Sequence, residues 1–204
     1  MHASSSRKRA RCAADDDAAE SAATPSDSLD LLRRDGTAVY FCADVTKATV
    51  FKLLQLLREA TACALEHAHP GRDPSVHLYV HSDGGDVFAG LSAYDHIRAN
   101  RVPVTTVADG MVASAASLLL LAGETRLAMS HASVLIHQLS TGFAGKYADL
   151  LDEVQNSSAL MDSLHAIYRA RTDMSAKRLA VLLKKERCLD ATRCLREGFV
   201  HALV

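Results

Sequence analysis

Apolar and polar positions follow two alternating periods along the chain after about residue 36. Three apolar runs have the composition of buried strands: AVYFC at 38–42, VHLYVH at 76–81, and the run at 102–107. Between them, apolar residues recur at helical spacing over 46–67, with Thr46 as the predicted N-cap, and again from Val87 to Ile97. Because strands alternate with helices, the pattern predicts an α/β fold with mostly parallel strand pairing.

The middle of the chain contains shorter elements. The strand at 102–107 is predicted to end at Asp109-Gly110, where the dipeptide signals a turn, and a helix is predicted to start near Ser114. Two short strands are then predicted at 125–129 and 133–137. Each strand-to-helix turn of such a fold lies at the same edge of the sheet, where ligands and chemistry collect.

A long helix is predicted at 146–170, because one apolar stripe continues along it. The stripe consists of Tyr147, Leu150, Leu151, Val154, Met161, Leu164 and Tyr168. A shorter helix follows from Ser175. The chain is then predicted to close with a strand at 187–189 and a last helix that Asp190 caps and Gly198 ends.

Residues 1–30 differ from the rest because they carry Ala, Ser and Asp without apolar periodicity. We predict a disordered tail over 1–30 and one folded domain over 31–204. The run Arg7-Lys8-Arg9-Ala10-Arg11 is interpreted as a solvated basic patch, with a nuclear address as the alternative.

Composition narrows the class of protein. The chain has 204 residues, of which 49% are hydrophobic and 23% charged, with a net charge of −1, which is typical of a soluble globular domain. No charge excess points to nucleic acid, and the longest apolar run, 112–123, is shorter than the roughly 20 residues that cross a bilayer. Five cysteines without a C-x-x-C pair indicate a reducing intracellular compartment, with cytoplasm preferred over an organelle matrix or the nucleus. We expect no metal and no organic cofactor.

Two turns carry candidate chemistry. Ser82-Asp83-Gly84-Gly85 follows a strand, and its paired glycines leave a backbone N–H uncovered. In Gly110-Met111-Val112-Ala113-Ser114 a serine among small residues precedes an apolar helix, whose N-terminus favours developing negative charge. A serine hydroxyl needs a base within hydrogen-bond reach, and His137 at the end of the strand SVLIH is the candidate. Ser117, one turn further along, is interpreted as a packing residue.

In this order and spacing, the motifs resemble the Clp protease proteolytic subunit (ClpP) family. That family carries S-P-G-G, then G-x-A-A-S with the nucleophile, then I-H-Q-P with the base, which match 82–85, 110–114 and 136–139 of this chain. The resemblance covers about 36–204. It includes Gly142 to Gly145, similar to the family's substrate-binding strand, and the long helix, similar to its protruding "handle" helix. It implies the ClpP/crotonase-like fold.

The resemblance implies a serine endopeptidase that hydrolyses unfolded polypeptides. Ser114 would be the nucleophile, His137 its base, and Glu186 the orienting acid. The backbone N–H groups of Gly85 and Ala115 would form the oxyanion hole. An extended substrate would lie along Asp86, Val87, Thr141, Gly142 and Phe143.

The implied partners are further copies of the chain and an ATPase of the AAA+ class. The family forms seven-membered rings, two of them stacked, and receives unfolded chains from that ATPase. Tyr79 matches an aromatic position of the family's ATPase-docking surface, whereas His77 replaces a second docking tyrosine. The homo- or hetero-oligomeric character of the rings stays open.

The chain departs from the family pattern at its acids. Glu186 stands where the family has aspartate, and Asp190 is the alternative acid, although an N-cap role is preferred for it. Asp83 and Asp86 flank the paired glycines and would oppose an oxyanion if they pointed inward.

Two alternative functions stay open, and these departures favour the first of them. The first is a catalytically weakened or silent ring subunit of the same fold. The second is a crotonase-type acyl-CoA enzyme.

Overall fold

The computed structural model describes residues 29–69 and 73–204. Most of the predicted disordered tail, its basic run included, and residues 70–72 lie outside the described residues. Within the described part, the strands form one sheet in the order β1-β2-β3-β4-β5-β8, with β6 beside β4 and β7 beside β6. Their bounds are β1 Leu32–Asp35, β2 Ala38–Phe41, β3 Val76–Ser82, β4 Val104–Ala113, β5 Thr125–Ala128, β6 Ser133–Leu135, β7 Leu189–Asp190 and β8 Ala202–Leu203.

Parallel pairing dominates this sheet, which confirms the predicted α/β class. The pairs β2–β3, β3–β4, β4–β5, β4–β6 and β5–β8 are parallel. Only β1–β2 and β6–β7 are antiparallel among the described strands. One face of the central strands is buried, where Val39, Leu78 and Val80 are fully enclosed, whereas the alternate residues His77, Tyr79 and His81 of β3 are half-buried or exposed.

Strand β4 differs from its prediction. It does not end at Asp109-Gly110 but continues to Ala113. Its first part pairs with β5 up to Ala108, and its last part, from Met111, pairs with β6. Gly110, with φ +81°, lies between the two parts, so the expected turn is a bend at which one strand changes neighbour.

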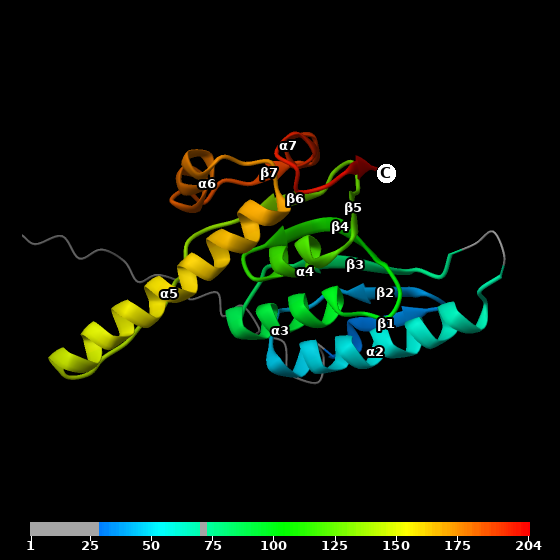
Figure 1. The fold of residues 1–204 in the computed structure, drawn as a ribbon, viewed down its shortest axis with the longest axis horizontal. Helices are drawn as coiled ribbons and strands as arrows, with labels where there is room; N and C mark the ends of the chain where they lie inside the picture. Colours follow the sequence, from blue (N-terminus) through cyan, green and yellow to red (C-terminus); the bar gives the residue numbers. More distant parts are fainter. Residues whose placement is uncertain (1–28, 70–72) are drawn as a thin grey trace, which may run out of the picture.

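Helices α2 (Lys47–Glu66), α3 (Val87–Arg98) and α4 (Ala116–Ala122) pack together against the sheet (Figure 1). Thr46 caps α2 as predicted, because its hydroxyl accepts a hydrogen bond from the Thr49 N–H at 3.1 Å. Asp86 caps α3 in the same way through the Ala89 N–H at 2.9 Å.

Helix α5 (Tyr147–Arg171) extends away from the sheet (Figure 1). Of its predicted apolar stripe, only Leu164 and Tyr168 near the C-terminal end are buried. Near the other end, Tyr147 is 77% exposed and Val154 63% exposed. The protruding helix is therefore anchored by its last three turns.

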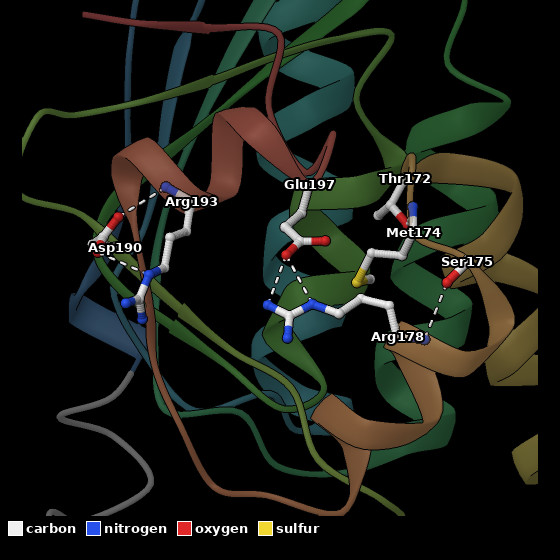
Figure 2. Close-up of polar contacts among 7 residues, drawn as sticks. All are labelled: Thr172, Met174, Ser175, Arg178, Asp190, Arg193 and Glu197. Atoms are coloured by element: carbon white, nitrogen blue, oxygen red, sulfur yellow. Dashed lines mark hydrogen bonds and ion pairs between the residues drawn. The ribbon is translucent and has the colours of Figure 1, made fainter.

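Helices α6 (Ala176–Leu183) and α7 (Ala191–Arg196) lie beside β6 and β7, and an ion pair between Arg178 and Glu197 links α6 to the end of α7 (Figure 1 and Figure 2). Arg178 contacts the Glu197 carboxylate at 2.7 Å, and Asp190 accepts from the Arg193 N–H at 2.8 Å. The predicted N-cap role of Asp190 is confirmed. Gly198 ends α7 with φ +75°, also as predicted. Over residues 29–69 and 73–204, no helix combines the length and apolar character needed to cross a bilayer.

Candidate active site

Ser114 lies in a left-handed turn between β4 and α4. Its φ is +53°, a conformation that costs a residue other than glycine on the order of 1–3 kcal/mol and that clusters at functional sites. The Ser114 N–H donates to the Leu135 carbonyl of β6 at 2.8 Å, and its own carbonyl accepts from the Ser117 N–H at 3.0 Å. Both backbone groups are thus held, and α4 begins at Ala116 rather than at Ser114 itself.

The glycine turn after β3 packs directly against this serine. A Cβ at Gly84 would lie 2.6 Å from the Ser114 Cβ and 2.8 Å from the Ala113 carbonyl oxygen. Gly84 also has φ +106°, which favours glycine on backbone grounds alone. The first glycine of the pair is therefore required for the two turns to approach each other.

The structure brings the predicted nucleophile and base together. His137 Nε2 lies 2.8 Å from Ser114 Oγ, within hydrogen-bond distance. The contact follows from the sheet, since β4 and β6 are parallel neighbours in the register Ala113 with Leu135, and each side chain comes just after its strand. His137 is half-buried, so its ring faces both the protein and the open site.

Two backbone N–H groups beside Ser114 have no protein acceptor within the described residues: those of Gly85 and Ala115. Gly85 is held by its neighbours, because Val45 donates to the Gly84 carbonyl at 2.7 Å and Asp86 donates to the Val45 carbonyl at 2.8 Å. Both residues line the same cavity as Ser114. Free donors fixed beside a nucleophile are what an oxyanion hole requires.

A cavity of about 940 Å³ opens in front of the Ser114–His137 pair. Its walls include the start of α3, the residues after His137 and the inner face of α5. Of the predicted substrate contacts, Asp86, Val87 and Thr141 line it, whereas Gly142 and Phe143 do not. Residues 141–146 form no strand, because no neighbouring strand supplies ladder hydrogen bonds to them in the described chain.

The acidic residues are placed differently from the Ser114–His137 pair. Glu186 is exposed in the segment between α6 and β7, and among the described residues it makes no hydrogen bond to His137. Asp190 serves as a helix cap (Figure 2). Asp86 directs one carboxylate oxygen to its own helix, and Asp83 lines a separate cavity beside Lys47.

Sequence reasoning missed a buried polar pair, Ser117 and Tyr168, behind Ser114. The Ser117 hydroxyl bonds both the Ser114 carbonyl at 2.6 Å and the Tyr168 hydroxyl at 2.7 Å. Burial raises the pKa of Tyr168 to about 12, with the Ser117 hydrogen bond acting in the opposite direction. No sequence signal links two residues that are 51 positions apart.

The family model for Clp protease matches residues 44–204. The chain belongs to the Clp protease family. The match covers nearly all of the described residues and agrees with the resemblance of the two turns and the histidine strand. It does not favour the acyl-CoA alternative.

One curated relative is the ATP-dependent Clp protease proteolytic subunit of Deinococcus radiodurans. It is 31% identical to this chain over 134 residues, which are 65% of this chain and 66% of the relative. The matched stretch therefore spans just under two thirds of that relative's length.

Proposed function

We propose that this Clp protease family member is a serine endopeptidase with Ser114 as nucleophile and His137 as general base. The observation that carries the proposal is the 2.8 Å contact between Ser114 Oγ and His137 Nε2, at a left-handed turn that opens on a cavity. A serine hydroxyl held at this distance from an imidazole is activated for attack on a carbonyl carbon.

The peptide bond would be cleaved in two steps. Ser114 Oγ attacks the carbonyl carbon while His137 Nε2 takes its proton, and the same proton then passes to the leaving amine as the C–N bond breaks. A water molecule next attacks the acyl-enzyme, with His137 again accepting and returning a proton. The N–H groups of Gly85 and Ala115 would stabilise the oxyanion, each by roughly 3 kcal/mol.

The substrate would bind as an added strand along Asp86-Val87 and Thr141-Gly142-Phe143. Residues 141–143 are exposed and form no ladder within the described chain, so their backbone groups are available to an extended peptide. Peptide binding would then complete the strand that the chain alone does not form.

Glu186 is proposed as the orienting acid for His137. Its support is the link between the two segments, because the Gln138 N–H donates to the Leu183 carbonyl at the end of α6 at 2.8 Å. The residue after the base is thereby tied to the segment that carries Glu186. The exposure of Glu186 favours the second candidate function, a catalytically weakened or silent subunit of the same assembly.

The proposed assembly is a pair of stacked seven-membered rings served by an AAA+ ATPase, acting on unfolded polypeptides in the cytoplasm. Exposed apolar residues on α5, such as Tyr147 and Val154, support contacts between copies. The Tyr79 ring stacks on Tyr40, with centroids 4.8 Å apart, and the pair supports the ATPase-docking surface.

The deciding experiment is labelling of the purified full-length chain with a fluorophosphonate probe, followed by mass-spectrometric mapping of the modified residue. Labelling at Ser114, absent from Ser114→Ala, supports the endopeptidase. An unlabelled chain that sediments as a ring, beside a control peptidase that reacts normally, would support the silent subunit instead.

A further inference from the structure

The nucleophile's carbonyl group is held by a relay that begins on helix α5. Tyr168 is buried, and its hydroxyl lies 2.7 Å from Ser117 Oγ. Ser117 is fully buried, and its Oγ lies 2.6 Å from the carbonyl oxygen of Ser114. The relay therefore connects α5, which forms a wall of the cavity, with the backbone of the residue that carries the reacting hydroxyl.

The direction of both hydrogen bonds follows from donor and acceptor chemistry. A carbonyl oxygen can only accept, so the Ser117 hydroxyl proton points to Ser114. Ser117 has no second proton, so the Tyr168 hydroxyl must donate to Ser117 Oγ. The Ser117 hydroxyl thus accepts from Tyr168 and donates to Ser114, and no other assignment of the two protons satisfies both hydrogen bonds.

We propose that Ser117 and Tyr168 are positioning residues for Ser114, an inference that rests on the proposed peptidase function. The Ser114 N–H is fixed to β6, the strand that leads to His137, while its carbonyl is fixed to Ser117. Holding a residue at both backbone groups keeps it in a conformation that would otherwise relax. Without the relay, the peptide after Ser114 turns more freely and Ser114 Oγ spends less time near His137 Nε2.

A purely structural role would make the labelling rate of Ser114 follow stability in a set of three variants, whereas a positioning role separates the two quantities. Ser117→Ala removes both hydrogen bonds and leaves the Tyr168 hydroxyl buried without a partner, which lowers the unfolding temperature. Ser117→Ala combined with Tyr168→Phe removes that orphaned hydroxyl and regains part of the loss. Tyr168→Phe alone keeps the bond from Ser117 to Ser114. Stability therefore ranks the double variant above Ser117→Ala.

The test measures the second-order rate of fluorophosphonate labelling at Ser114 and the unfolding temperature of each full-length variant at matched concentration. We expect labelling to fall about 10-fold in Ser117→Ala and equally in the double variant, since one directed hydrogen bond is lost in each. Tyr168→Phe should show a smaller fall. The unfolding temperature should drop by on the order of 2–4 °C in Ser117→Ala and partly recover in the double variant.

The matched control is Ser158→Ala, which removes a hydroxyl-to-carbonyl bond of 2.8 Å on the exposed face of α5 and should label like the parent. If the double variant regains both its labelling rate and its stability, the positioning role is overturned, while the peptidase proposal still stands. No labelling of the parent chain would overturn the peptidase proposal and this inference with it. If Ser117→Ala does not fold, the double variant against the parent decides, because it carries no orphaned hydroxyl.

Discussion

The proposed nucleophile and the proposed acid are held in opposite ways. Ser114 is fixed through its N–H, its carbonyl and the close approach of Gly84, all by buried or half-buried groups. Glu186 lies in the segment 184–188, every residue of which is exposed, and the backbone bonds there are local ones from Lys185 to Leu182 and from Arg187 to Lys185. One chain therefore brings Ser114 and His137 together by itself, whereas its fold does not fix Glu186, the proposed acid.

This contrast predicts where catalytic sensitivity lies. A group held by the sheet register keeps its geometry in every copy of the chain, because shifting it would disturb several buried strands. A group on an exposed segment can take its position from a neighbouring molecule or from the substrate. Substitutions near Ser114 and His137 should accordingly change the rate more than a substitution of Glu186.

The largest effect is expected at the proposed base, His137. His137→Ala should lower peptide hydrolysis by on the order of 10⁴-fold or more, because the remaining serine hydroxyl is a poor nucleophile. The measurement is the kcat for a fluorogenic peptide, with sedimentation to verify unchanged assembly. A residual rate near that of the parent would show that another group activates Ser114.

A large effect is also expected at Gly84. Gly84→Ala places a Cβ against Ser114 at a φ of +106°, so we expect a roughly 100-fold loss of the Ser114 labelling rate and about 2 kcal/mol of stability. Gly36→Ala is the matched control, since Gly36 also has a positive φ, +57°, but open space around its Cβ position. Equal rate losses in both variants would mean that backbone strain alone is responsible.

An intermediate effect is expected from Tyr168, whose hydroxyl bonds Ser117 behind the proposed nucleophile, at high pH. Burial raises the pKa of Tyr168 from 10 in the unfolded chain to about 12 in the folded chain. The folded state then binds this proton more tightly, so the contribution is present below pH 10 and is lost as the pH rises from 10 to about 12. It amounts to at most about 3 kcal/mol.

Denaturant unfolding of the parent and of Tyr168→Phe across this pH range measures that contribution. The parent should lose more stability than the variant, and tyrosinate absorbance should report the same transition. Cys194, whose pKa burial also raises to about 12, is present in both proteins and cancels in the comparison. If the free energy of unfolding falls with pH equally in both proteins, Tyr168 has the same pKa in the folded and unfolded chains.

The smallest effect is expected at Glu186. Removing a tightly bonded triad acid costs on the order of 10⁴-fold in rate. Because Glu186 makes no hydrogen bond to His137 in the described chain, Glu186→Gln should cost only about 10-fold in kcat. Glu186→Asp should raise the rate if Glu186 is a displaced triad acid. A full 10⁴-fold loss in Glu186→Gln would show that assembly brings the acid into contact.

The sequence predicted the parts of the site that depend on local signals. Strand ends, glycine turns and helix caps place Ser114 and His137 at one edge of the sheet, and Thr46 and Asp190 cap their helices as their residue types indicate. The class of fold followed from the alternation of strand and helix periods.

Long-range geometry could not be predicted in the same way. The positive φ of Ser114 depends on contacts from β6 and from Ser117, and the relay to Tyr168 needs two positions far apart in sequence to be packed together. The Asp109-Gly110 signal was correct for a bend but wrong for a strand end, because β6 offers β4 a second neighbour. Residues 141–146 lack a strand because pairing partners, rather than side chains, decide whether a strand forms.

The relay of hydrogen bonds from Tyr168 through Ser117 to Ser114 also bears on the order of folding during synthesis. The hydrogen bond between Ser117 and Tyr168 spans 51 positions, so it cannot form until the ribosome has added most of α5. Chains are made at roughly 5–20 residues per second, and contacts between distant positions close late in folding. Ser114, the proposed nucleophile, therefore receives its full set of backbone restraints only after most of the domain has been made.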